Sequence, residues 1–68
     1  MSEGLVRHER KGMGYEKVKQ DSRVTVKDGI VMLRRINGED ITIQGTVEVH
    51  KGDEIYWTAD CTYTQRHS

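Results

Sequence analysis

The chain has 68 residues, of which 34% are hydrophobic and 32% are charged, and its 11 Lys and Arg balance 11 Asp and Glu. A chain this short forms one domain with a thin core, because it buries only about 60% of the surface that it exposes when unfolded. Cys61 is the single cysteine, so an internal disulfide is excluded, and the three histidines have no zinc-ligand spacing with it. The composition therefore predicts no metal or other cofactor, and it favours association with a second copy or with another chain to complete the core.

The sequence contains no signal-peptide apolar region and no apolar run long enough to span a membrane, which together with a free thiol predicts a cytoplasmic protein. Charge is distributed unevenly along it. Residues 1–36 carry nine Lys and Arg against five Asp and Glu, whereas residues 37–68 carry two against six. Such a chain can bind an anionic partner at one end or pair head to tail with its own copy; alternatively, the charges only keep two faces solvated.

Residues 1–14 combine three glycines with alternating charges and few apolar side chains, which predicts a flexible basic and polar arm. Residues 15–68 are predicted to form a single β domain. Within it, residues 15–20 are ambiguous between a weak strand and one helical turn. After them, β-branched runs alternate with turn residues, which predicts strands joined by hairpin turns. These strands are 23–27, 30–36, 41–50 and 54–65, joined at Asp28-Gly29, Asn37-Gly38 and Lys51-Gly52-Asp53.

The last two predicted strands alternate most regularly, with apolar residues at odd positions from Ile41 to Tyr63. This period of two predicts a long antiparallel hairpin with one buried and one solvated face. Cross-strand partners share a face, so a three-residue loop 51–53 would pair Val47 with Trp57 and Gly45 with Ala59. Two small residues opposite each other predict a bend there, as at the corner of a small barrel, or the close approach of another backbone.

Together these elements predict an all-β fold. We expect a small antiparallel meander of four to five strands, either as a partly open barrel or as a sheet completed by dimerisation.

Predicted strand 30–36 is apolar on both of its sides. Val31 and Leu33 join the main core if the loop around Asn37-Gly38 has an odd length or a bulge. The opposite side then carries a second apolar patch, which either packs under the arm or binds a partner. The predicted partner-binding residues are Ile30, Met32, Arg34, Ile36 and Tyr56.

No residue pattern indicates a reaction. Ser2, Ser22 and Ser68 lie outside the strand-turn-helix context of a nucleophile, and Cys61 falls on the apolar face, where free cysteine acts as a small hydrophobe. His50 lies near carboxylates at a predicted hairpin end, which is typical of a solvated surface. The chain is therefore predicted not to be an enzyme and to have no catalytic residues.

Two kinds of binding remain. The first is a non-enzymatic protein-interaction module of the adaptor or inhibitor type, forming a homodimer and binding a protein partner of unknown identity; a viral or mobile-element inhibitor is one concrete form. The alternative is a small β-barrel that binds nucleic acid through its basic half. Against it, aromatic residues are few and the acidic second half dilutes the positive field. The predicted nucleic-acid-binding residues are Arg7, Arg10, Lys11, Tyr15, Lys17, Lys19, Arg23 and Lys27.

Overall fold

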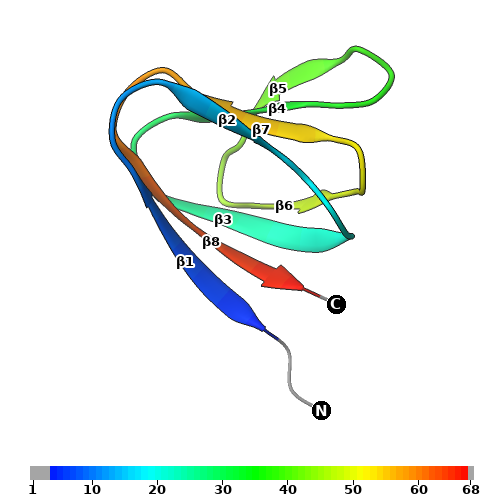
Figure 1. The fold of residues 1–68 in the computed structure, drawn as a ribbon, viewed down its shortest axis with the longest axis horizontal. Coiled ribbons are helices and arrows are strands. Elements are labelled where there is room, and N and C mark those ends of the chain that lie inside the picture. Colours follow the sequence, from blue (N-terminus) through cyan, green and yellow to red (C-terminus); the bar gives the residue numbers. More distant parts are fainter. Residues whose placement is uncertain (1–3, 68) are drawn as a thin grey trace.

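The structure is a computed structural model and describes residues 4–67. In this part of the chain, two antiparallel four-stranded sheets lie one above the other, in the orders β1-β8-β3-β6 and β2-β7-β4-β5 (Figure 1). No helix among these residues is long and apolar enough to cross a membrane. The strands are β1 (Leu5–Arg10), β2 (Gly14–Lys17), β3 (Ser22–Asp28), β4 (Val31–Arg34), β5 (Asp40–Thr42), β6 (Thr46–Val49), β7 (Glu54–Trp57) and β8 (Cys61–His67).

The two sheets are the halves of one four-stranded sheet that is folded across its middle. β1 continues into β2, β3 into β4, β5 into β6 and β7 into β8, and these four long segments have the same neighbours in both halves. Backbone hydrogen bonds continue the strand pairing up to the line along which the sheet is folded: Val26 N donates to Gly45 O at 3.2 Å, and Ile43 N donates to Val31 O at 2.9 Å. We call this line, where all four segments bend, the crease.

Glycine makes the crease sterically feasible. Gly12, Gly29 and Gly45 lie in three of the four bends and have φ angles of 73°, 85° and 70°, which side chains disfavour. Gly29 also packs against the fourth bend, since a Cβ there would lie 2.6 Å from the carbonyl oxygen of Asp60. Asp60 in turn accepts a hydrogen bond at 2.6 Å from Gly12 N. The bends therefore depend on one another across the sheet.

The hydrophobic core lies between the two halves. Alternation along each strand sends every second side chain inward, and the odd positions of β6, β7 and β8 do point there. Trp57 and Tyr63 are the largest of these, with ring centroids 6.1 Å apart. The buried apolar residues of the core are Val18, Val24, Val31, Leu33, Ile43, Val49, Ile55, Trp57, Cys61 and Tyr63.

The predicted hairpin from Ile41 to Gln65 is wrong, although its buried face and its bend at Gly45 are confirmed. β6 pairs with β3, which sets Val47 opposite Val24, and β7 pairs with β2 and β4, which sets Trp57 opposite Gly14 and Val31. Alternation determines the face of a strand but not its neighbour, and both pairings satisfy the same parity.

The fold is all-β, as predicted, but it differs from the predicted meander of four to five strands. It has eight strands in the described residues, non-consecutive strands are neighbours, and neither sheet closes into a barrel. Asp28-Gly29 is a bend with an irregular register rather than a hairpin turn, because β3 and β4 belong to different halves. The Asn37-Gly38 turn is confirmed: a loop of odd length, 35–39, sets Leu33 opposite Ile41.

The predicted arm also needs correction. Leu5–Arg10 forms β1, which pairs with β8 at six positions, and Gly14–Lys17 forms β2, so residues 15–17 of the ambiguous segment 15–20 are a strand. β1 is an edge strand whose half-buried positions are the polar His8 and Arg10, so it has no apolar alternation that would mark it as a strand. Residues 1–3 of the predicted arm lie outside the described residues.

Asp53 ties together three connections at the end of the molecule opposite the crease. Its carboxylate accepts hydrogen bonds from Ile36 N at 3.2 Å and from His50 N at 2.9 Å, and its carbonyl accepts one from Val18 N at 2.8 Å. Arg35 Nη1 lies 3.6 Å from the same carboxylate. Asp53 is buried, and these partners satisfy it.

Candidate functional site

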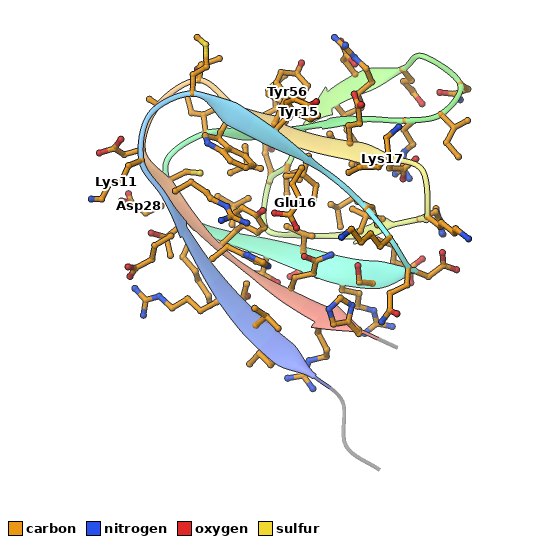
Figure 2. All side chains as sticks on the ribbon, in the orientation of Figure 1. Lys11, Tyr15, Glu16, Lys17, Asp28 and Tyr56 are labelled. Atoms are coloured by element: carbon orange, nitrogen blue, oxygen red, sulfur yellow. The ribbon has the colours of Figure 1, made fainter. Side chains whose placement is uncertain are left out.

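Tyrosine and methionine side chains line up on the outer face of the sheet β2-β7-β4-β5. The register sets Tyr15 opposite Tyr56, Tyr56 opposite Met32, and Met32 opposite Thr42. Figure 2 shows Tyr15 and Tyr56 close together on this sheet. Tyr15 is 71% exposed, Tyr56 and Met32 are half-buried, and Thr42 Oγ1 donates to Met32 Sδ at 3.2 Å. We call these four residues the aromatic row.

The next row, farther from the crease, is made of charges of alternating sign. Lys17 is opposite Glu54, Glu54 is opposite Arg34, and Arg34 is opposite Asp40. Arg34 Nε and Nη2 donate to the two oxygens of Asp40 at 2.9 and 3.2 Å, and these hydrogen bonds hold the pKa of Asp40 below its usual value. We call these four residues the charged row; its net charge is zero.

Arg34 joins the two rows. Its guanidinium carbon lies 5.4 Å from the ring centroid of Tyr56, within the range of a cation–π contact. The planar guanidinium thus meets an aromatic ring on one side and a carboxylate in its own plane. This arrangement holds Arg34 and Tyr56 in fixed positions on the face.

The face is also apolar near the crease. Met13 is 78% exposed and Ile30 is 66% exposed, and both share the parity of the aromatic row on their segments. A shallow groove of about 400 Å³ runs from Met13 past Tyr15 and Tyr56 to Arg34, with Trp57 at its edge. Gly14 lies opposite Trp57 and leaves room for its ring, because a Cβ at that position would lie 3.0 Å from the Trp57 indole.

The structure places most of the predicted partner-binding residues together. Met32, Arg34 and Tyr56 are neighbours on the outer face, and Ile30 lies at the crease beside them. Ile36 lies elsewhere, in the loop 35–39, where its side chain packs against Gly52. Sequence reasoning did not assign Tyr15 and Met13 to this surface, because alternation is too short around residues 13–17 to show that β2 joins the sheet.

The predicted nucleic-acid-binding residues are divided among several places. Arg7, Arg23 and Lys27 lie in the other sheet, whereas Tyr15 and Lys17 lie on the face just described. Arg10 lies between the sheets, Lys11 lies at the crease with Nζ 4.0 Å from Asp60 Oδ2, and Lys19 lies in the connection between β2 and β3. The structure therefore does not gather them into one surface.

The outer face of β1-β8-β3-β6 is basic and rich in threonine. One row runs from Arg7 through Thr64 and Thr25 to Thr46, and Thr25 and Thr46 share a hydrogen bond of 2.8 Å. In the next row Arg23 lies directly opposite Arg66. On its other side Arg23 lies opposite Glu48, whose Oε2 is 3.8 Å from Arg23 Nε. We call this surface the basic face.

A chain of polar side chains fills the space between the sheets near β1. Arg10 Nη2 lies 3.0 Å from His8 Nδ1, and His8 Nε2 lies 3.2 Å from Gln65 Oε1. Gln65 Nε2 donates to Ser22 Oγ at 2.8 Å, and Ser22 Oγ donates to the carbonyl of Gln20 at 3.2 Å. The donors are consistent in direction when His8 is neutral and carries its proton on Nε2.

Glu16 and Tyr63 continue this network. Glu16, on the opposite side of β2 from Tyr15, forms an ion pair with Arg10 and accepts a hydrogen bond from the Tyr63 hydroxyl at 3.3 Å (Figure 2). The Tyr63 ring stacks on His8 with centroids 4.7 Å apart. Burial, followed by the charge of Glu16, raises the pKa of Tyr63 to about 12, so it is a neutral phenol.

Chemically, this network is suited to fixing the spacing of the sheets. Tyr63 holds its proton, and burial raises the pKa of the Cys61 thiol, which disfavours a reactive thiolate. Among residues 4–67, no group of three His, Cys, Asp or Glu could hold a metal ion. The network therefore has a structural role, whereas the aromatic row lies on the surface and is the better candidate for binding another molecule.

Comparison with known proteins adds no assignment: no family model matches the chain, and no curated protein or solved structure matches it significantly.

Proposed function

We propose that this protein is a small interaction module that binds another protein chain on the outer face of β2-β7-β4-β5. The observation that carries the proposal is the outward-facing row of Tyr15, Tyr56 and Met32, continued by the exposed Met13 and Ile30 at the crease. A continuous apolar patch of more than a few hundred Å² is rare on a monomeric protein, and Tyr and Met are enriched at the centres of protein interfaces.

Charge favours a protein over a nucleic acid at this face. The charged row has two cations and two anions, so the face offers no net attraction to phosphates. A single-strand binder combines aromatic rings with a positive groove. Here the outward-facing tyrosines, Tyr15 and Tyr56, are on one face of the molecule, and the basic face is in the other sheet.

The module is proposed to act by occupying a partner's surface, as an adaptor or an inhibitor does. Arg34 and Tyr56 are its expected anchors, because each is already held in place before binding by the cation–π contact and by Asp40. Anchors that lose little freedom on binding contribute more affinity than mobile ones.

Site-specific photo-crosslinking in cells that make the protein tests this proposal. A photoreactive residue is placed at position 32, at the centre of the aromatic row, or at position 25, at the centre of the basic face. We expect protein adducts at position 32 that exceed those at position 25 and that are lost when Tyr56→Ala is added. Equal yields at both positions, or none at position 32, would contradict the proposal.

A second candidate function rests on the basic face. Arg23, Lys27 and Arg66 line a shallow groove of about 450 Å³ on this face, and these cations would attract an anionic ligand into the groove. The hydroxyls of Thr25 and Thr46 lie on the same face, and cations together with hydroxyls are suited to binding the phosphate backbone of a nucleic acid. Such binding does not require aromatic residues that stack on bases.

Titration of labelled duplex DNA at several salt concentrations tests this second candidate. Arg23→Gln is expected to weaken binding at all sequences and to reduce the salt slope by about 1. Lys17→Gln, on the other sheet, serves as the matched control and should leave the slope unchanged. Equal effects of the two variants would contradict this assignment.

A further inference from the structure

We infer that the partner of this face is a second copy of the chain, packed face to face about a two-fold axis that runs parallel to the strands and between β7 and β4. The inference rests on the proposed function and specifies its partner. It derives from the order of charges in the charged row, because that order complements itself under one rotation.

The rotation can be followed along the charged row. A two-fold axis parallel to the strands reverses the strand order but preserves the position along each strand. Read across the sheet, the row is positive, negative, positive, negative, from Lys17 to Asp40. Its reversed copy is negative, positive, negative, positive. Lys17 therefore meets Asp40 of the second copy, and Glu54 meets Arg34 of the second copy, so every charge faces its opposite.

The aromatic row fits the same rotation. Tyr56 comes to lie over Met32 of the second copy, and Tyr15 lies over Thr42 of the second copy. Sulfur beside an aromatic ring is a favourable contact. The exposed Ile30, near the crease, is carried to the same end of the interface in both copies and is also covered.

Other placements of the axis fail on charge or burial. An axis through β7 would set Glu54 over itself and Lys17 over Arg34 of the second copy. An axis through β4 would set Arg34 over itself. An axis perpendicular to the strands keeps the strand order, so it would set the charged row either over the same charges of the second copy or over apolar residues, which would desolvate charges without partners. Only an axis between strands avoids these contacts, and the one between β7 and β4 overlaps all four strands.

Three features of the molecule favour association with a second copy. Its core is thin, its single cysteine, Cys61, is free and so forms no disulfide that would stabilise the core, and large apolar side chains on this face are in contact with water. Stacked sheets align within about 30° because of their twist, so contacts near the axis are preserved best. Glu54 and Arg34 are on the two strands beside the axis and should therefore contribute most to the charge pairing.

Sedimentation equilibrium of the full chain, with charge-reversed variants, tests the inference. Glu54→Arg and Arg34→Glu each set like charges across the axis and are expected to raise the dimer dissociation constant by roughly tenfold or more. The double variant restores opposite charges across the axis and is expected to recover most of the wild-type affinity. Glu48→Arg, the same change on the basic face, is the matched control and should have no effect.

The double variant separates the dimer from folding of the single chain. Within one copy, each of the three variants has two like-charged neighbour pairs and one opposite pair along the charged row, so the double variant is no more favourable than the single ones for the isolated sheet. Recovery of dimerisation therefore cannot come from a better-folded monomer. Circular dichroism melts check that each variant is folded; if a single variant is not, the swap of Lys17→Asp with Asp40→Lys provides the same test at the outer pair.

Three results would overturn the inference: a wild-type chain that stays monomeric, a dimer that none of these reversals weakens, or a double variant as weak as the single ones. The proposed function fails on a different result. We call the outer face of β2-β7-β4-β5 the docking face. If position 32 crosslinks to another protein while the wild-type chain is monomeric, the docking face binds a protein and only its assignment to a second copy is wrong.

Discussion

The two outer faces of this folded sheet are made by the same four chain segments, yet they differ in chemistry. On β2-β7-β4-β5, an apolar row of tyrosine and methionine lies beside a row of alternating charge. On β1-β8-β3-β6, threonines lie beside two opposed arginines. The inward-facing residues of each segment form the core, so the outward-facing residues of the two sheets can serve different functions.

The crease connects the two faces, because all four chain segments bend there from one sheet into the other. Gly29→Ala is expected to destabilise the fold by about 3 kcal/mol or more, since a left-handed φ and a contact with backbone both oppose a side chain. Gly45→Ala, with a similar φ but open space around it, should cost about 1 kcal/mol. Urea unfolding of both variants measures the difference, and equal losses would show that the crease is not packed as described.

The burial of Tyr63 between the two sheets can be tested by the pH dependence of the free energy of unfolding. The unfolded phenol of Tyr63 ionises near its ordinary pKa of about 10, whereas in the fold the pKa is raised to about 12. The stability that this group contributes is therefore complete below pH 10 and is lost as pH rises through 12, by roughly 2 kcal/mol.

Urea unfolding between pH 9 and pH 12 follows this loss, and Tyr63→Phe should lack that part of the pH dependence. A wild-type stability that is flat through this range would mean that Tyr63 is accessible to water in the fold.

A matched pair of exposed edge residues sharpens the comparison of the faces. Tyr15 is 71% exposed on β2 of the docking face, and Leu5 is 57% exposed on β1 of the basic face. Replacing either with Ala is expected to change the stability of the monomer by no more than about 0.5 kcal/mol. Only Tyr15→Ala should weaken dimerisation, as measured by sedimentation equilibrium; a similar loss with Leu5→Ala would remove the distinction between the faces.

The salt concentration should have the smallest effect on dimerisation, and it distinguishes the contribution of the charged row from that of the aromatic row. Raising the salt concentration from 0.1 to 1 M shortens the Debye length from about 10 Å to about 3 Å, which screens the charged row but not the aromatic row. We expect the dimer dissociation constant to rise only a few-fold, since exposed ion pairs each contribute about 1 kcal/mol or less. Complete dissociation in high salt would mean that charge, rather than apolar burial, holds the copies together.

The sequence predicts the side on which most residues lie, because alternation is a local property. Trp57 and Tyr63 are buried, Tyr56 and Met32 are on the outer side, and Gly45 is at a bend, all as expected. Which strands pair could not be predicted in the same way. Glycine after aspartate at residues 28–29 is typical of a hairpin turn, but here it bends one segment into the second half of the sheet.

The candidate site could be predicted only in part for the same reason. Met32, Arg34 and Tyr56 share a parity that the sequence shows, and they are indeed together. Tyr15 joins them through a pairing between β2 and β7, strands that are 40 residues apart in the chain, so no local pattern could indicate it. β1 was missed because its half-buried positions are His8 and Arg10, which pack into a polar network rather than an apolar core.

A dilution series of amide chemical shifts tests most directly whether the docking face binds a second copy. We predict that concentration-dependent shifts concentrate on β2, β7, β4 and β5, with the largest at Tyr56 and Arg34, and that Thr25 and Arg23 on the basic face stay unchanged. Shifts that cluster on the basic face, or that are absent at every concentration, would contradict the account.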